Sequence, residues 1–191
     1  MQNYDQTKKR FWLLVEPWSH RLINIALHHC GDKNLAQDWS QETLLRAWKD
    51  FEQLEDSTLI YAWLLKILNR VIVDDQRRNI RRKNLSPVIF VDDVYFSTHA
   101  CSAPGPFSQL MKNQSNSQLK AAILQLPEEF RSTILLRDIE GMSYASIASI
   151  LDIAKGTVMS RLSRGRRLLS SYVLKQDFSI QNTDTIEMEE L

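Results

Sequence analysis

Glycine and proline are scarce in this 191-residue chain, with five of each, and no apolar run approaches the length of a membrane span. Few glycines and prolines leave long segments free to follow a helical pattern, so the sequence predicts an all-α protein. A bilayer requires about 20 consecutive apolar residues, and the start MQNYDQTKKRF lacks the apolar core of a signal peptide. We therefore expect a cytoplasmic protein with no direct membrane insertion.

Cysteine is rarer still, and the familiar catalytic motifs are missing. Cys30 and Cys101 form neither a CxxC motif nor a disulfide framework, which agrees with a reducing compartment. His28, His29 and Cys30 are consecutive, and side chains on one helix diverge by about 100° per residue, so a metal site completed by His99 and Cys101 is not expected. A glycine-rich phosphate loop and a G-x-S-x-G motif are also lacking. The sequence predicts no enzyme, no metal and no cofactor.

The formal net charge is only +1, but the charges are distributed unevenly along the chain. The final segment, 176–191, contains no basic residue and five acidic ones, Asp177, Asp184, Glu187, Glu189 and Glu190. The rest of the chain therefore holds 24 basic against 18 acidic residues. Such a body favours binding to a polyanion. We expect the acidic tail to be solvated and disordered, with docking on the basic surface as the alternative.

The stretch from Met142 to Tyr172 joins a short apolar helical pattern to a strongly basic one. Ser143 suits the N-cap of the first helix, and Asp152 suits the left-handed residue of a tight turn. On a helical wheel, the second helix has an apolar face of Val158, Leu162, Gly165 and Leu169 and an opposite face of Ser160, Ser163, Arg164 and Arg167. This pattern is typical of a recognition helix in the DNA major groove. The alternative is a solvated basic face on an ordinary helical hairpin.

The first 83 residues show three further helical patterns. Segments 10–30 and 34–51 are amphipathic, and a polar loop over 52–58 separates them from a basic helix over 61–83. Helical spacing predicts that the core is made of Trp12, Leu13, Val15, Leu22, Ile25, Ala26, Leu35, Trp39, Leu44, Ala47, Trp48, Phe51, Trp63, Leu64, Ile67, Val71 and Val73. Tyr61 and Trp63 fit this core better than they fit a role as stacking platforms for bases.

Residues 84–116 lack helical periodicity and contain many serines and prolines, which is typical of a flexible linker. Within them, VIFVDDVYF is apolar enough to form a short strand or to dock on a partner. The sequence therefore predicts two small helical domains, 1–83 and 117–175, joined by the linker 84–116 and followed by the tail 176–191.

Three motifs extend over most of the chain in a fixed order: NLAQDWSQETLLRAW, YAWLLKILNRVIVDDQRRNIRRK and LPEEFRSTILLRDIEGMSYASIA. They resemble, in turn, the D-x-x-QE-x-F-x-x-A-W segment, the −10-melting helix and the LPxxxRxxxxLRxxEGxSYxEIA signature of extracytoplasmic-function (ECF, group IV) sigma factors of bacterial RNA polymerase, in the sigma-70 family. The resemblance implies a two-domain protein that binds core polymerase and directs promoter-specific initiation through the −10 and −35 elements. It also implies control by an anti-sigma factor.

The same resemblance assigns three groups of contacts. Contacts to the largest catalytic subunit of core polymerase would come from Asp38, Gln41, Glu42 and Arg46. Contacts to the −10 DNA would come from Lys66, Arg70, Arg77, Arg78, Arg81 and Arg82, and the loop Phe51 to Ile60 would offer a pocket for an unstacked base. Contacts to the −35 DNA would come from Lys155, Thr157, Ser160, Arg161, Arg164 and Arg167, in a domain that also binds the second-largest subunit.

The chain departs from the family pattern at a few positions. Arg70 stands where the family has asparagine, and Asp152, Ala154 and Met159 replace a common glycine, proline and lysine. The preferred promoter sequence therefore cannot be carried over. Asp74 matches a family position and is predicted to pair with a nearby arginine.

Other functions remain open at this point. A stand-alone helix-turn-helix regulator would leave the polar face of residues 38–46 and the basic segment 77–83 unexplained. A protein that sequesters polymerase would bind core without opening a promoter. A nucleic-acid-processing enzyme would need clustered carboxylates, and Asp74 and Asp75 alone are weak support for one.

Overall fold

The computed structural model describes residues 2–83 and 116–186, with side chains over 5–81 and 118–174. Regular structure within these ranges is entirely helical, which confirms the predicted all-α class. The chain divides into two compact units, an N-terminal one that contains α1 to α3 and a C-terminal one built mainly from α5 to α8. The apolar VIFVDDVYF segment, together with His99 and Cys101, lies outside the described residues.

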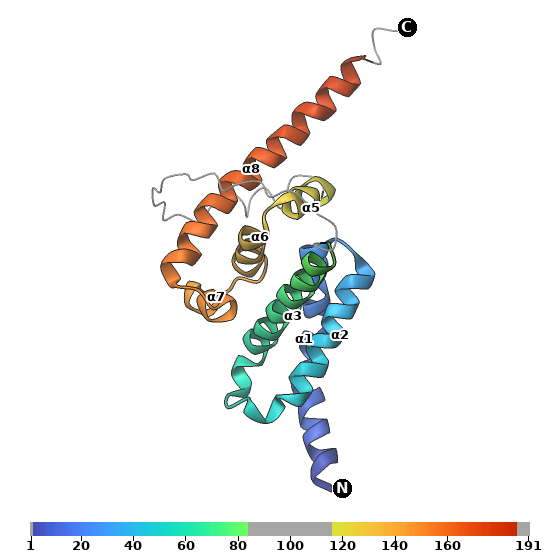
Figure 1. The fold of residues 1–191 in the computed structure, drawn as a ribbon, viewed down its shortest axis with the longest axis vertical. Helices are drawn as coiled ribbons and strands as arrows, with labels where there is room; N and C mark the ends of the chain where they lie inside the picture. Colours follow the sequence, from blue (N-terminus) through green and yellow to red (C-terminus); the bar gives the residue numbers. More distant parts are fainter. Residues whose placement is uncertain (1, 84–115, 187–191) are drawn as a thin grey trace. The chain divides into compact units, whose positions relative to one another are not determined.

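The N-terminal unit consists of three long helices that lie side by side (Figure 1). They are α1 (Gln2–Cys30), α2 (Lys33–Lys49) and α3 (Ile60–Lys83). The segment between α2 and α3 was predicted to be a polar loop over 52–58. In the structure it contains two short 3-10 helices, η1 (Phe51–Gln53) and η2 (Ser57–Leu59). At the turn before α2, Gly31 takes a positive φ of 73°, and the Asp32 carboxylate accepts a hydrogen bond from the Leu35 N–H at 2.9 Å.

Apolar side chains from all three helices form the core of this unit. The buried ones include Phe11, Val15, Leu22, Ala26, Ala36, Trp39, Ala47, Leu64, Leu65, Leu68, Val71 and Ile72. The prediction was wrong for Trp12 and Leu13, which are 47% and 76% exposed. Because Phe11 points into the core, the helical turn of about 100° per residue directs the next two side chains away from it. Tyr61 is buried as predicted, whereas Trp63 is half-buried.

The C-terminal unit is built on one long helix. Its elements are α5 (Asn116–Gln125), α6 (Glu128–Ile134), the π-helical turn η3 (Leu135–Ile139), α7 (Tyr144–Leu151) and α8 (Lys155–Ile186). Both α5 and α6 pack against α8. Figure 1 shows the last turns of α8 extending beyond α5 and α6. The prediction of a disordered tail was wrong for its first part, because α8 continues to Ile186.

Two arginines of the LPxxxRxxxxLR motif hold the turns of this unit. The Arg131 guanidinium donates hydrogen bonds of 2.6 to 3.2 Å to three backbone carbonyl groups over residues 123–126, and so caps the end of α5. Arg137 donates to the Met142 carbonyl oxygen at 2.8 Å, and its guanidinium carbon lies 4.9 Å from the centre of the Tyr144 ring. Both arginines of the motif therefore stabilise the fold of the C-terminal unit.

The helix-turn-helix follows the local signals in the sequence. Ser143 caps α7, because its hydroxyl oxygen accepts a hydrogen bond from the Ser146 N–H at 3.0 Å. Asp152 takes the left-handed conformation that was predicted for it, with φ 56°. The N–H of Ile153 then reaches back to the Ala148 carbonyl oxygen at 3.1 Å, which closes the turn between α7 and α8.

Candidate functional site

The solvent-facing side of α2 carries the polar residues that the sequence assigned to polymerase binding. Asp38 and Gln41 are exposed, and Glu42 is half-buried. The opposite side of the helix is buried through Ala36, Trp39, Ser40, Thr43 and Ala47. The Ser40 and Thr43 hydroxyls on this side each donate to a backbone carbonyl one turn earlier at 2.7 Å, so both hydroxyls are hydrogen-bonded although they are buried. The fold therefore leaves Asp38 and Gln41 open to solvent and Glu42 partly so.

Arg46, the fourth residue of that group, links α2 to α3. Its Nε donates to the Glu42 carboxylate at 2.8 Å, and its Nη1 donates to the Asp74 carboxylate at 2.8 Å. The Asp74 and Glu42 hydrogen bonds raise the pKa of Arg46, and the bond from Arg46 lowers the pKa of Asp74. The predicted pairing of Asp74 with an arginine is confirmed. Arg46 is thus held in place inside its own unit.

Changing Asp74 to asparagine is expected to lower the stability of the N-terminal unit at neutral pH by about 0.5–1 kcal/mol, since the bond to Arg46 is partly exposed. The pKa of Asp74 is depressed below 3.8 in the folded state, so its contribution is complete above that value. It disappears as the pH falls through the lower folded pKa. Urea unfolding followed from pH 7 to pH 3 should show the wild type and D74N converging at the acidic end. A constant difference at every pH would contradict this account.

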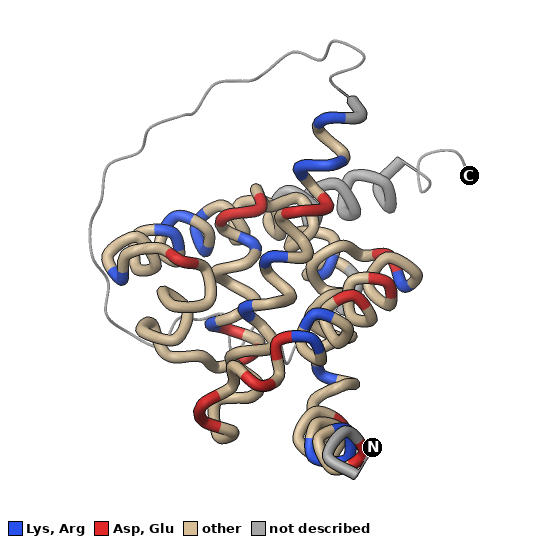
Figure 2. The backbone as a smooth tube through the Cα atoms, turned by 60° about the horizontal axis from the view of Figure 1, so that its bottom comes forward, with Lys and Arg blue, Asp and Glu red and all other residues tan. Residues whose placement is uncertain are grey.

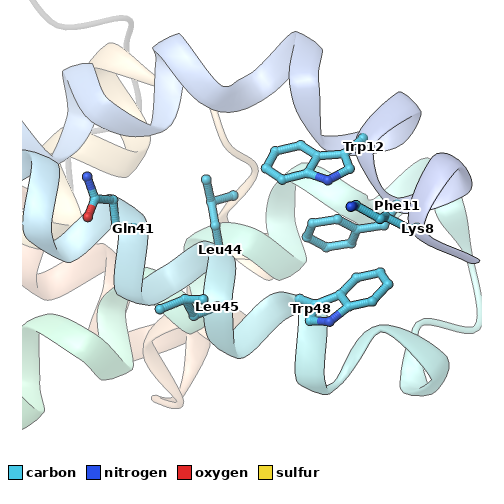
Figure 3. A pocket seen from close by; sticks show the side chains of 7 residues that line it. All are labelled: Lys8, Phe11, Trp12, Gln41, Leu44, Leu45 and Trp48. Carbon is cyan, nitrogen blue, oxygen red and sulfur yellow. The ribbon is translucent and has the colours of Figure 1, made fainter. Parts of the chain in front are cut away.

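A groove between α1 and α2 lies beside the polar side of α2, which it meets at Gln41 (Figure 3). It encloses about 400 Å³ and is lined by Lys8, Phe11, Trp12, Gln41, Leu44, Leu45 and Trp48. In Figure 3 the aromatic rings lie at one end of the groove and Gln41 lies at the other. The Phe11 ring meets Trp12 and Trp48 edge-to-face, with centroids 5.5 and 5.2 Å apart.

The groove is an apolar surface open to solvent, because Trp12 and Leu45 are 47% and 58% exposed. Sequence reasoning missed it, since it assigned Trp12 and Leu44 to the core. The sequence did contain a signal for the groove. The number of apolar residues on α1 is larger than a single buried face of that helix can hold. Gln41 belongs both to this groove and to the polar face of α2, so the two surfaces are continuous.

The basic face of α3 carries the residues assigned to −10 DNA. Lys66 is half-buried, and Arg70, Arg77, Arg78 and Arg81 are exposed. Figure 2 shows positive residues concentrated in the last described turns of α3, just before the grey segment. The side chain of Arg82 lies outside the described residues. Positions 66, 70, 77 and 81 are spaced by whole helical turns, so they share one stripe along α3 that suits a polyanionic strand.

The start of α3 is fastened to α1 through aromatic contacts. The Tyr61 ring stacks on Trp18 with centroids 4.6 Å apart, and the Arg21 guanidinium lies 4.9 Å from the centre of the Tyr61 ring. Tyr61 therefore serves the packing of the unit. In the preceding loop, Asp56 accepts hydrogen bonds from the hydroxyl and backbone N–H of Thr58, which lower the pKa of that carboxyl group.

The basic residues of α8 separate into two groups by their partners. Arg161 donates to Glu129 at 3.2 Å, and Arg166 donates to Asp138 at 2.7 and 3.2 Å. The Asp138 hydrogen bond raises the pKa of Arg166. These two arginines hold α8 against α6 and η3, so Arg161 has an internal role that the resemblance did not indicate.

The second group is exposed to solvent. Lys155, Arg164 and Arg167 are exposed and make no ion pair within the described part of the chain. Thr157 and Ser160 are half-buried, and the Ser160 hydroxyl donates to the Thr157 carbonyl oxygen at 3.0 Å. On the other side of the helix, the predicted apolar face is confirmed, because Val158, Leu162, Gly165 and Leu169 are all buried. The open face of α8 is the side that holds Thr157, Ser160, Arg164 and Arg167, so it combines short residues with two exposed cations, and Lys155 lies at the start of the helix.

Residues 5–81 and 118–174 are the part of the chain whose side chains the structure describes. There, the His, Cys, Asp and Glu side chains form no cluster of three that could hold a metal ion. Likewise, among the described helices, none has the length and apolar character required to cross a bilayer.

The sequence matches two family models, one for each unit. "Sigma-70 region 2" matches residues 14–82, which run from α1 to the end of α3. "Sigma-70, region 4" matches residues 116–169, which run from α5 into α8. The two matches together take in the polar face of α2, the basic face of α3 and the open face of α8.

Several sigma factors are similar to this chain over most of its length. The ECF RNA polymerase sigma factor SigE of Mycolicibacterium smegmatis is 31% identical over 172 residues, which are 90% of this chain and 65% of that protein. The RNA polymerase sigma-H factor of Pseudomonas aeruginosa is 29% identical over 85% of both chains. The sigma factor RpoE from Bartonella quintana, solved with the anti-sigma factor NepR, has a TM-score of 0.64 and 27% identity over 92% of this chain and 98% of its own. This chain thus spans just under two thirds of SigE and most of the other two.

Proposed function

The chain belongs to the sigma-70 family of RNA polymerase sigma factors, in its extracytoplasmic-function group, and from this premise we propose that it directs core polymerase to specific promoters. In this proposal the N-terminal unit binds core polymerase through α2 and engages the −10 element through α3. The C-terminal unit reads the −35 element through the open face of α8. The chain acts as a non-catalytic specificity subunit, and an anti-sigma factor restrains it.

The observation that carries the proposal is the pairing of two matched regions with three solvent-exposed surfaces, one in the C-terminal unit and two in the N-terminal unit. The C-terminal unit offers Lys155, Arg164 and Arg167 to DNA, and the N-terminal unit offers a polar and apolar docking face on α2 as well as a basic stripe on α3. A stand-alone helix-turn-helix regulator would use α8 alone. It would give no role to the exposed Asp38 and Gln41.

Run-off transcription with purified core polymerase tests this function directly. The reaction contains a pool of promoter fragments from the native host and is run with and without the chain. Discrete start sites that require the chain are expected, and comparison of their upstream sequences then defines the −10 and −35 elements. Binding to core polymerase without any new start site would favour a sequestering protein. Binding to DNA with no affinity for core polymerase would favour a stand-alone regulator.

The polymerase-binding surface in this proposal extends from Gln41 into the groove between α1 and α2. Leu45→Ser should weaken the affinity for core polymerase about five- to tenfold, the loss expected when one exposed leucine no longer becomes buried on binding. Leu45 is 58% exposed, so the unfolding midpoint should stay unchanged. Titration of fluorescently labelled chain with core polymerase measures the effect.

Leu13→Ser is the matched control for that experiment, because Leu13 is 76% exposed on α1 and does not line the groove. Its affinity for core polymerase should equal that of the wild type. If both serine variants bind equally well, or are weakened equally, the groove is not part of the polymerase-binding surface.

Control by an anti-sigma factor is the remaining part of the proposal. It is supported by the similarity to RpoE from Bartonella quintana, which was solved with the anti-sigma factor NepR. Affinity purification of the tagged chain from its native host, before any stress is applied, should recover it bound to a second protein that competes with core polymerase. Recovery only as free chain or with polymerase would count against such control.

A further inference from the structure

Two residues on the open face of α8 are not explained by the packing of the unit. Gly156 lies in the first turn of the helix, and a Cβ atom added there would meet no atom within 4 Å. Glycine is less favourable than alanine in a helix, so the fold gains nothing from its presence. Met159, one turn later, is 50% exposed and is the large apolar side chain on this part of the surface.

Gly156 and Met159 belong to an uncharged strip at the start of α8. Positions 156, 159, 160 and 163 fall within about 100° of one another around the helix axis, so they lie on one side of the helix, and none of them carries a charge. Arg164 and Arg167 follow this strip toward the C-terminus of the helix and are exposed. Exposed cations therefore border a surface that carries no charge of its own.

Within the uncharged strip, the side chain of Met159 limits which chemical group on DNA can be recognised at its position. Base edges in the major groove present hydrogen-bond donors and acceptors and a single apolar group, the C5-methyl of thymine. The thioether of methionine donates no hydrogen bond, and its flexible, polarisable side chain adapts well to apolar partners. The first residues of a recognition helix are the ones that reach base edges.

We propose that Met159 is a specificity-determining residue that contacts the C5-methyl group of a thymine in the −35 element, and that Gly156 allows α8 to approach the DNA closely enough for this contact. The inference rests on the proposed function, since it requires that the open face of α8 reads promoter DNA. Met159 would then select thymine through an apolar contact, whereas a charged residue at this position would bind a phosphate.

Replacement of thymine by deoxyuridine tests the contact, because it removes only the methyl group. Each thymine on either strand of the −35 element, as located by run-off transcription, is replaced singly, and competition binding is measured with holoenzyme assembled from the full chain. For the wild type, one replacement should weaken binding about fourfold, the loss expected for one methyl group that is no longer buried. With Met159→Ala, the thymine and deoxyuridine promoters should bind equally at that position.

Two further variants keep the test decisive. Met159→Leu retains an apolar side chain and should preserve most of the discrimination, whereas Met159→Lys should remove it while keeping general DNA affinity. Wild-type holoenzyme that initiates normally but binds every deoxyuridine promoter as tightly as its parent would overturn this inference and leave the proposed function intact. A chain that initiates no transcription with core polymerase would overturn both.

Discussion

Replacing Gly165 with valine is expected to lower the free energy of unfolding of the C-terminal unit by about 3 kcal/mol, through overpacking between α6 and α8. A Cβ atom built on Gly165 would lie 2.9 Å from Ile134 Cδ1 and 3.0 Å from Phe130 Cβ. The Ile134 methyl group can move, but the Phe130 Cβ is fixed to its backbone. Small domains have about 0.05–0.15 kcal/mol of stability per residue, so this loss is a large share of the total.

The distribution of tryptophan allows this prediction to be measured in the intact chain. All five tryptophans lie in the N-terminal unit, so their fluorescence reports its unfolding, while far-UV circular dichroism reports the helices of both units. In urea, Gly165→Val should show an early transition by circular dichroism, with the fluorescence midpoint unchanged. The effect should be smaller for Gly165→Ala, which adds only the Cβ atom.

Gly156→Ala is the matched control, since it makes the same change in the same helix where a Cβ atom would meet nothing. Its unfolding midpoint should equal or slightly exceed that of the wild type. If Gly165→Val unfolds at the wild-type urea concentration in both signals, the close approach of α6 and α8 described above is wrong.

A Cβ atom would clash at Gly165 but not at Gly156, and the sequence alone could not predict this difference. The apolar face of α8, Gly165 included, follows from helical periodicity alone. The same is true of the Ser143 cap and the left-handed Asp152, because each depends on a few neighbouring residues. Close packing requires glycine at position 165 because Phe130 lies against it. Phe130 is 35 positions away in the sequence, and no local pattern indicates that the two residues are close.

Burial on α1 escaped prediction for a related reason. Its N-terminal half has apolar residues on more than one side, so periodicity does not single out the buried face. The positions of α2 and α3 select Phe11 and Val15, which leaves Trp12 and Leu13 outside. The groove lined by Trp12 and Leu45 is a product of this selection, and it could be recognised only after the helices were placed.

The arginines of α8 show the same limit at the candidate DNA-binding face. Arg161, Arg164 and Arg167 carry the same charge and lie on one basic helix, and the sequence assigned all three to −35 DNA. The structure gives Arg161 and Arg166 carboxylate partners on α6 and η3, whereas Arg164 and Arg167 are left exposed. Pairing over some thirty positions of sequence requires the fold, and it separates the arginines that hold the helix from those available to DNA.

This separation leads to the second large effect. The double variant Arg164→Ala and Arg167→Ala should weaken holoenzyme binding to a promoter between about tenfold and a hundredfold, because it removes two exposed cations from the face that meets DNA. If both side chains bind phosphates, the slope of log K against log salt concentration should become shallower by about 0.9 for each arginine removed. Neither side chain forms an ion pair in the described part of the chain, so the unfolding midpoint by circular dichroism should be unchanged.

Two control variants show whether weaker promoter binding comes from a lost DNA contact or from a damaged fold. Lys120→Ala removes an exposed cation from α5 in the same unit and should leave promoter binding and its salt dependence almost unaltered. Arg166→Ala should instead lower the unfolding midpoint, since it leaves Asp138 without its partner. If the double variant loses helicity together with DNA binding, Arg164 and Arg167 support the fold. If it binds promoters as tightly as the wild type, the open face of α8 is not the surface that reads DNA, and the −35 contact must be sought on another face of the unit.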